Sequence, residues 1–314
     1  RELEAYGNRG VEEEETVVEE VIVPERPLFN DAPLGGSSVV TTDEGNIPGM
    51  GSQHETSATQ PFGAATDGSF HMQLHGADAT VTIGGTELKV ENGKLYHNGV
   101  EVTADAAVSV PGGAHGTLTV TGMDADGTVH YTYTLTAPVD ATGNASNRPG
   151  EGDAGRGEAV RADAFDVSIT TTGGTATGQI TVDALDDAPV LSTLDTTQTT
   201  VADGEAALTG TLSFTPGADA EGAQVTVEVE GQTFTGTKGE NGWTFTGGSD
   251  GSSFQLNGTA FTYTRPSSNT TDGRNDTIIL KVTVTDGDGD TAEQSVTVNT
   301  VAGPLFEGAP SGGS

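Results

Sequence analysis

The chain of 314 residues contains no cysteine. That absence excludes disulfide bonds, zinc–thiolate sites and thiol nucleophiles together. Basic residues are also few, because 12 lysines and arginines stand against 46 aspartates and glutamates, which gives a formal net charge of −34. Such an excess of negative charge argues against nucleic acid and anionic membrane surfaces as partners, and it favours cations.

Long hydrophobic runs and aromatic side chains are scarce too. No run of about 18 apolar residues occurs, so we expect no membrane insertion. No amino-terminal signal segment is recognisable, which fits either an internal fragment or a carboxyl-terminal secretion signal. Aromatic residues make up only 5% of the chain, which disfavours a sugar-binding cleft lined by exposed rings. No serine, histidine and aspartate set stands in a recognisable context, and carboxylate pairs are too common to be informative, so we expect no enzyme.

What the sequence does contain is short strings of alternating apolar and polar residues between turns rich in glycine, aspartate and asparagine. This pattern predicts an all-β fold of tandem immunoglobulin-like β-sandwich domains joined by short linkers. The expected strands of the first domain are 70–74, 79–83, 87–90, 117–120, 128–135, 164–169 and 179–182. Those of the second, about seven in number as in an immunoglobulin domain, are 207–214, 224–229, 242–246, 254–256, 260–264, 277–284 and 292–298.

A recurring phrase divides the chain into units. It reads Asn30-Asp31-Ala32-Pro33, then Asp186-Asp187-Ala188-Pro189, and more weakly Glu307-Gly308-Ala309-Pro310. Residues 27–37 also align with 304–314 over 11 positions with three mismatches. Repetition of this kind indicates a modular architecture.

The phrases predict four segments. Residues 1–32 form an acidic linker, in which 16–24 has the β-branched composition of a strand that docks on another domain. Residues 33–187 form the first β-sandwich, with a long loop at 138–161 that lacks periodicity. Residues 188–301 form the second sandwich, and 302–314 form a junction to a following repeat.

Acidic turns carry the clearest chemical signal. Asp286, Asp288 and Asp290 alternate with glycine between two expected strands, and a glycine-rich turn lets such carboxylates converge on a cation. The alternative is an acidic hairpin turn without an ion. The spacing does not fit an EF-hand, because the twelve-residue loop and its flanking helices are missing.

Other acidic residues stand at the domain ends, where carboxylates from a linker and from the loops on either side can share ions. An ion at such a place would stiffen a hinge. Oxygen ligands of this kind suit Ca²⁺, which is the cofactor we expect. The candidates are Asp31, Asp186 and Asp187 in the junction phrases, Asp43 and Glu44 in the first domain, Asp203 and Glu205 in the second, and Asp124 and Asp126 in a weaker acidic turn.

The phrases together resemble the repeat domains of giant type I-secreted bacterial adhesins, the RTX adhesins, which have cadherin-like and VCBS-like sandwiches. The residues that carry the resemblance are 282–292, 186–190, 43–49 and 131–135, and the match covers about 30–310. The first domain departs from the pattern, since 168–175 replaces the expected acidic turn. The nonapeptide RTX repeat is missing altogether.

The resemblance implies an extracellular, surface-anchored stalk made rigid by Ca²⁺, which supports attachment and biofilm formation. By analogy with cadherin junctions, Asp31, Asp186 and Asp187 would be linker ligands, with Asp286, Asp288 and Asp290 at the hairpin. Its partners would be neighbouring repeats of the same polypeptide. Two alternatives remain: a filament subunit that joins other copies of itself through 16–24 or the Pro-Leu-Phe segments, and a tip module that binds glycans or proteins.

Overall fold

The computed structural model describes residues 23–30, 36–51, 63–139, 156–202, 207–240, 242–266 and 277–301. In these ranges the secondary structure is β-strand apart from two 3₁₀ turns, η1 (Glu44–Asn46) and η2 (Ala104–Ala106). The prediction of an all-β fold is therefore confirmed. No helix in the described ranges is long and apolar enough to cross a membrane.

The first domain is a sandwich of two sheets. One sheet has five strands in the order β1 (Leu28–Phe29), β3 (Ala65–Gln73), β10 (Thr128–Leu135), β9 (Gly116–Met123) and β8 (Val108–Val110). The other has seven, in the order β2 (Gly36–Asp43), β12 (Gly174–Asp187), β11 (Arg156–Thr171), β4 (Ala79–Ile83), β5 (Thr86–Glu91), β6 (Lys94–His97) and β7 (Val100–Glu101).

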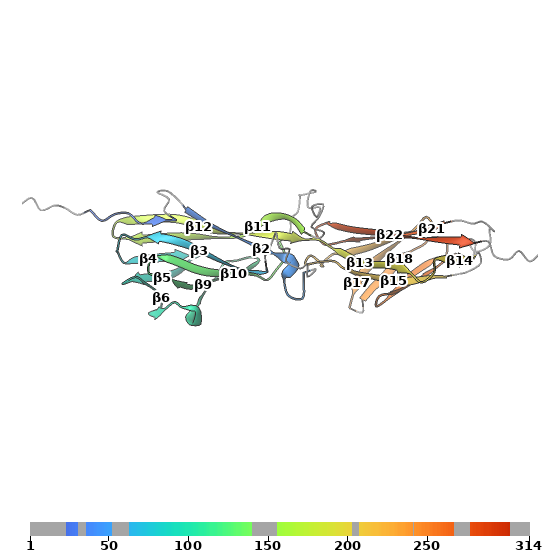
Figure 1. The fold of residues 1–314 in the computed structure, drawn as a ribbon, viewed down its shortest axis with the longest axis horizontal. Helices are drawn as coiled ribbons and strands as arrows, with labels where there is room; N and C mark the ends of the chain where they lie inside the picture. The colour runs from blue at the N-terminus through green and yellow to red at the C-terminus, as the bar shows by residue number, and fades with distance from the viewer. Residues whose placement is uncertain are drawn as a thin grey trace, which may run out of the picture.

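The second domain repeats this plan with two further sheets. The four-stranded sheet runs β13 (Val190–Thr196), β15 (Ala207–Thr215), β20 (Ala260–Thr264) and β19 (Ser253–Asn257). The six-stranded sheet runs β14 (Thr200–Ala202), β22 (Thr291–Val301), β21 (Thr277–Thr285), β16 (Gln224–Val229), β17 (Gln232–Gly239) and β18 (Gly242–Gly247). The two sandwiches lie end to end along one axis (Figure 1).

Each domain has its own hydrophobic core, because strand alternation sends every second side chain inward. In β16 and β21, for example, Val227, Val229, Leu280 and Val282 are almost fully buried, and the residues between them face outward. The first core is built around Tyr131, Tyr133 and Phe165, and the second around Phe234, Phe254, Phe261 and Tyr263. No residue is shared between the two clusters.

The single tryptophan packs within the second sandwich. Trp243 meets Phe214 edge-on with 5.2 Å between ring centroids, and Phe245 on the same strand lies 4.8 Å from Phe254 on the facing sheet. These contacts give the alternating Trp-Thr-Phe string of β18 a packing role within the sandwich.

Two predictions about the strands need correction. The loop expected over 138–161 ends earlier, because β11 begins at Arg156 and pairs with β12 as far as Asp187. The second domain also has more strands than the seven expected, since β13, β14 and β17 were missed. Glycine and threonine dilute the apolar alternation in β17, which reads Gln-Thr-Phe-Thr-Gly-Thr-Lys-Gly, and backbone pairing to β16 and β18 decides its conformation.

Candidate cation site at the domain junction

The two sandwiches are joined by a very short connection. β12 ends at Asp187, two residues follow, and β13 begins at Val190. The end of β12 therefore lies between the last turns of the first domain and the first turns of the second. Acidic side chains from all three places meet at this point.

The first domain contributes Glu44 through its edge strand β2. β2 runs parallel to β12, with Asp43 opposite Leu185, so the residue after Asp43 arrives beside the end of β12. Asp43 Oδ1 accepts a hydrogen bond from the Gly45 N–H at 3.0 Å and so starts the η1 turn. Glu44 is fully buried, and its Oε1 accepts the N–H of Val139 at 2.5 Å.

The end of β12, just before the linker, contributes Asp186 and Asp187, which are 0% and 1% exposed. Asp187 Oδ2 accepts the N–H of Ala218 at 2.9 Å, which ties the linker to the second domain. Gly217 precedes this contact with a φ of +84°, a conformation that glycine adopts at little cost.

The second domain contributes Asp219 and the turn between β21 and β22. The carbonyl of Asp219 accepts the N–H of Gly287 at 2.7 Å, so the two loops are held together. Within the turn, Asp286 Oδ1 accepts the N–H groups of Gly289 at 3.0 Å and Asp290 at 2.7 Å. These bonds fold the Asp-Gly-Asp-Gly-Asp sequence into a compact loop.

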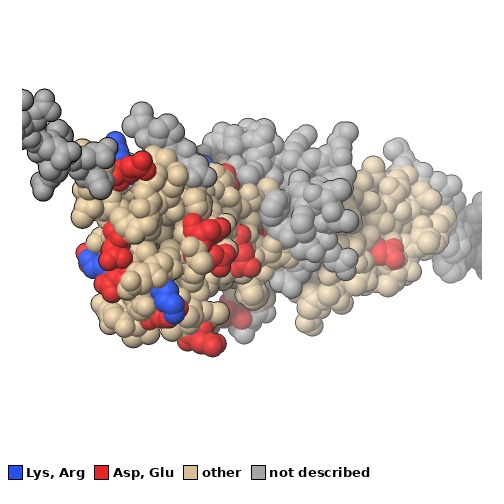
Figure 2. All heavy atoms as spheres, turned by 60° about the vertical axis from the view of Figure 1, so that its left-hand side comes forward, with Lys and Arg blue, Asp and Glu red and all other residues tan. Residues whose placement is uncertain are grey.

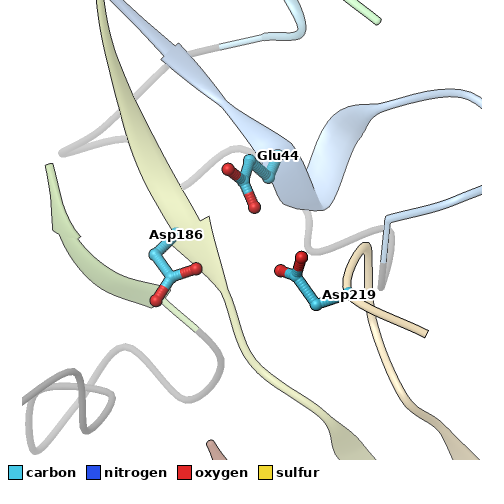
Figure 3. A group of neighbouring side chains, drawn as sticks. All are labelled: Glu44, Asp186 and Asp219. Carbon is cyan, nitrogen blue, oxygen red and sulfur yellow. The ribbon is translucent and has the colours of Figure 1, made fainter. Parts of the chain in front are cut away.

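The carboxylates form two adjacent groups. Glu44, Asp186 and Asp219 each place one oxygen within 4.8 Å of the others, and Asp286, Asp288 and Asp290 do the same. Figure 3 shows the first group, whose side chains point toward one another from η1, β12 and the loop before β16. No other such group of histidine and acidic side chains occurs in the described ranges.

Burial and mutual repulsion shift the protonation of these groups. Burial, together with the charges of Asp219 and Asp186, raises the pKa of Glu44 to about 10. Burial and the charges of Asp288 and Asp290 raise the pKa of Asp186 to about 8, so the two groups affect each other electrostatically. Such shifts mean that the ionised cluster is unfavourable without a compensating positive charge.

The hairpin group is shifted in the same direction. Burial, followed by the hydrogen bond and charge of Asp288, raises the pKa of Asp286 to about 9. Burial and the charge of Asp288 raise the pKa of Asp290 to about 6. In both groups, burial and repulsion between carboxylates therefore make the ionised state unfavourable.

Several buried oxygens in the cluster have no hydrogen-bond donor. They are Glu44 Oε2, Asp288 Oδ1 and Asp290 Oδ2, none of which has a hydrogen-bond partner in the described part of the chain. Two oxygens bound to one Ca²⁺ at about 2.4 Å are at most about 4.8 Å apart. The oxygen separations, the carboxylate chemistry and these unbonded oxygens all fit a divalent cation that prefers oxygen ligands.

Two acidic side chains elsewhere, the buried Asp163 and the partly buried Glu230, are hydrogen-bonded to protein donors. Asp163 accepts the N–H groups of Ala114, His115 and Gly116 at 2.7, 3.3 and 3.2 Å, and the Tyr133 hydroxyl at 2.5 Å. Glu230 accepts two hydrogen bonds at its Oε1 from Arg265, at 3.2 and 2.7 Å. The junction cluster differs from both because acidic oxygens face one another there.

The sequence-predicted ligands are thus distributed unevenly. The structure brings together Asp286, Asp288 and Asp290, and it places Glu44 with Asp186 in the first group. Asp187 lies beside them but bonds to the Ala218 N–H. Asp31, Asp203 and Glu205 lie outside the described residues.

Asp124 and Asp126, the candidate ligands of the weaker acidic turn, do not lie at the junction, and their role as ligands stays a prediction. They lie in the β9–β10 turn, beside β1, at the opposite end of the first sandwich. Asp124 is exposed and pairs with His130 at 2.8 Å, and Asp126 Oδ1 accepts the Thr128 N–H at 2.9 Å. Because neighbouring strands of this sheet are antiparallel, successive turns lie at opposite ends of the sandwich. The β9–β10 turn lies at the end away from the junction.

Asp219 is the ligand candidate that sequence reasoning missed. It stands in Pro-Gly-Ala-Asp-Ala-Glu-Gly, between two strands, without the Asp-Gly repetition that marked the hairpin. A signal was present in the acidic turn after β15, but nothing in one sequence shows which turns face the linker.

The architecture is a tandem of immunoglobulin-like or cadherin-like β-sandwich domains, as the sheet order shows. No protein family model matches the sequence. No curated protein sequence matches it significantly.

Solved structures with similar strand arrangements include the titin domains Z1Z2 in complex with telethonin. The titin pair is 12% identical to this chain. The alignment covers 88% of this chain and 96% of the titin pair, with a TM-score of 0.38. Drosophila N-cadherin EC1-4 is 12% identical, covers 89% of this chain and 51% of its own, and has a TM-score of 0.26. Similarities this low carry no argument about function.

Proposed function

We propose that the chain is an extender segment of a bacterial cell-surface adhesin, in which Ca²⁺ bound at the domain junction keeps consecutive sandwiches in line. The observation that carries this proposal is the convergence of buried carboxylates from the first domain, the linker and the second domain. The phrases that resemble RTX adhesin repeats support the extracellular location and the adhesive role.

The physical basis of the proposed stiffening is the shortness of the linker. A connection of two residues, 188–189, has few backbone torsions that bending can use. An ion held by Glu44, Asp186 and Asp219 would link three segments that otherwise repel one another. Domain motion is the default for interfaces within a chain, so the ion would convert a bending junction into a straight one.

The acidic surface suits the same role. Acidic side chains spread over the visible face of the first domain with few basic ones among them (Figure 2). A net charge of −34 destabilises a compact chain through self-repulsion unless counter-ions reduce it. Cation binding at the junction would relieve the repulsion among the carboxylates gathered there.

Thermal unfolding in Ca²⁺, in Mg²⁺ and in chelator tests the ion. We expect Ca²⁺ to raise the melting temperature because it binds only the folded junction. Mg²⁺ should do so less, since it keeps its waters and demands octahedral geometry. Glu44→Gln preserves the carbonyl that accepts the Val139 N–H and should lose much of the Ca²⁺ effect. Asp124→Asn removes an exposed carboxylate outside the cluster and should keep it.

Small-angle scattering tests the mechanical part. A chain straightened by the ion should have a longer maximum dimension and a narrower distribution of shapes in Ca²⁺ than in chelator. Equal melting curves and equal scattering in both conditions would leave the acidic turns without a mechanical role.

A further inference from the structure

The first strand of the first domain has a near-copy at the other end of the sequence. Residues 27–37 and 304–314 agree at all but three of 11 positions, and both begin Pro-Leu-Phe. Residues 304–314 lie outside the described ranges, whereas most of the first copy is described. The site that β1 occupies beside β3, called the β1 seat below, therefore shows where the second copy can bind.

The β1 seat lies at the edge of the five-stranded sheet, where the aromatic side chain of β1 is buried. β1 pairs with β3 over only two residues, Leu28 with Gln73 and Phe29 with Met72. Phe29 is fully buried, and its ring centroid lies 4.9 Å from that of Phe70. The strand is thus held by one aromatic side chain and a short backbone ladder, flanked by the bond from Arg26 to the Thr175 carbonyl at 2.7 Å and the contact of Glu25 with His75 at 2.6 Å.

Two glycines make room for this ring. A Cβ at Gly36 or at Gly178 would overlap the Phe29 side chain. Gly178 on β12 and Gly36 at the start of β2 are paired with each other, so both belong to the site that receives the ring. The second copy repeats the apolar residue that fills this site, with Phe306 in the place of Phe29.

The mismatch at Asn30 does not prevent the copy from fitting. Asn30 has a φ of +49°; its N–H donates to the His71 carbonyl at 2.8 Å, and its Oδ1 accepts the His71 N–H at 2.9 Å. Its counterpart is Glu307, whose side chain is one methylene longer but also offers an acceptor oxygen. Glu230 adopts a φ of +48° elsewhere in the chain, so glutamate can take this conformation.

The second domain shows how unusual the short strand is. Its first strand, β13, has seven residues and pairs with β15 over most of its length. Replacing β13 would break that whole ladder, whereas replacing β1 breaks the pairing of two residues. Among the strands of the described ranges, β1 is one of the two that pair over only two residues, and it is the one whose sequence recurs at 304–314.

The distance between the two ends of the molecule determines whether residues 304–314 can reach the β1 seat of their own chain. β1 and the end of β22 lie at opposite ends of the molecule (Figure 1). Only 302–303 separate Val301 from Pro304, and two residues span about 7 Å at most. The segment therefore cannot reach the seat of its own chain, and the donor must be a second copy.

We propose that residues 304–314 of one copy insert into the β1 seat of a second copy, with Phe306 in the pocket of Phe29. Seat and donor lie at opposite ends, so the contact is head-to-tail and extends into an open chain of molecules. The tethered β1 competes at an effective concentration in the millimolar range, so exchange requires crowding of copies. This interaction is independent of the cation site.

Engineered cysteines test the register directly, because the chain has none of its own. Leu28→Cys with Gln73→Cys should close a disulfide within one chain, since these positions are cross-strand partners. Leu305→Cys with Gln73→Cys should instead give a ladder of linked oligomers at about 1 mM protein, in the range where exchange competes. Adding Phe306→Ala should abolish the ladder.

The control pair is Leu305→Cys with Asp67→Cys, because Asp67 is an equally exposed position on the same face of β3 but far from the seat. The proposal is overturned if the Gln73 pair gives no more oligomer than the Asp67 pair. As a second measurement, sedimentation of the unaltered chain at the same concentration should show oligomers that Phe306→Ala removes. Identical sedimentation of the two chains would also overturn it.

Discussion

Asp186 is the residue at which the two acidic groups meet. Its side chain is fully buried and lies close enough to Asp288 and Asp290 for their charges to raise its pKa. A single residue at the end of β12 is thus close both to Glu44 of the first domain and to the hairpin carboxylates of the second. Substitutions here should separate repulsion from cation binding.

Asp186→Asn should have opposite effects in the two conditions. In chelator at pH 8 the neutral amide removes repulsion, and the melting temperature should rise by about 2–4 °C for each kcal/mol relieved. In Ca²⁺ the same variant should melt below the unaltered chain, because a ligand is lost. Calorimetry in both conditions checks the crossing, and a variant that is lower in both would show that Asp186 acts only in packing.

The raised pKa values also predict how stability depends on pH in the absence of divalent cations. Glu44 and Asp186 have folded pKa values of about 10 and about 8, above the ordinary values of 4.5 and 3.8. The folded chain therefore holds protons that the unfolded chain releases. Their stabilising effect is full below pH 4 and is lost as the pH rises toward 8 to 10.

Melting in chelator at pH 5.5, 7 and 8.5 measures this slope. We expect the melting temperature to fall across the series, and Glu44→Gln to flatten it. Ca²⁺ should have its greatest effect at the highest pH, where it no longer competes with protons. A melting temperature that rises with pH in chelator would contradict the charge arrangement described here.

At the scale of elements, the β21–β22 turn is fixed against the loop that carries Asp219. The Gly287 N–H donates to the Asp219 carbonyl, and a Cβ at this glycine would overlap the Glu221 carbonyl oxygen. The turn can therefore pack this closely against the loop of Asp219 only with glycine at this position. Backbone packing, as well as acidic composition, positions the hairpin carboxylates.

Gly287→Ala should displace the turn and lower both stability and Ca²⁺ affinity. Backbone atoms are the obstacle, so a cost of about 1–3 kcal/mol is expected from overpacking. Gly239→Ala is the matched control, because a Cβ there would only meet the Gly242 carbonyl oxygen at 3.7 Å. Calcium titration by calorimetry and thermal melting of both variants provide the comparison. Equal behaviour of the two would mean that the turn tolerates the shift.

At the scale of the whole molecule, two separate cores are connected by one short linker and one acidic cluster. Without a cation, little couples the unfolding of one domain to that of the other, because the two cores share no residue. With a cation bound by residues of both domains, the loss of either domain destroys the site. Ligand binding to a shared site couples the stabilities of the parts that form it.

Differential scanning calorimetry should therefore show two transitions in chelator and a single, sharper transition in Ca²⁺. Asp219→Asn removes the second domain's ligand from the first group and should restore two transitions in Ca²⁺. The exposed Asp195, which lies on β13 outside the cluster, gives the control variant Asp195→Asn. Two unchanged transitions in every condition would indicate that the domains are energetically independent.

The class of fold could be predicted from the sequence alone, and so could the acidic character of its turns. Alternation in stretches such as 128–135 and 224–229 predicts strands that the structure has with the same bounds, because strand periodicity is local. The Asp-Gly-Asp-Gly-Asp turn is local as well, so its three carboxylates were correctly expected to lie together.

Only the tertiary structure decided which distant acids join them. Glu44 reaches the end of β12 through a parallel pairing between residues more than a hundred positions apart, and Asp219 arrives from a loop with no distinctive sequence. Asp124 and Asp126 have a comparable local sequence but lie at the other end of the sandwich. Composition gives each turn its charge, whereas sheet topology sets the end of the domain at which that charge lies.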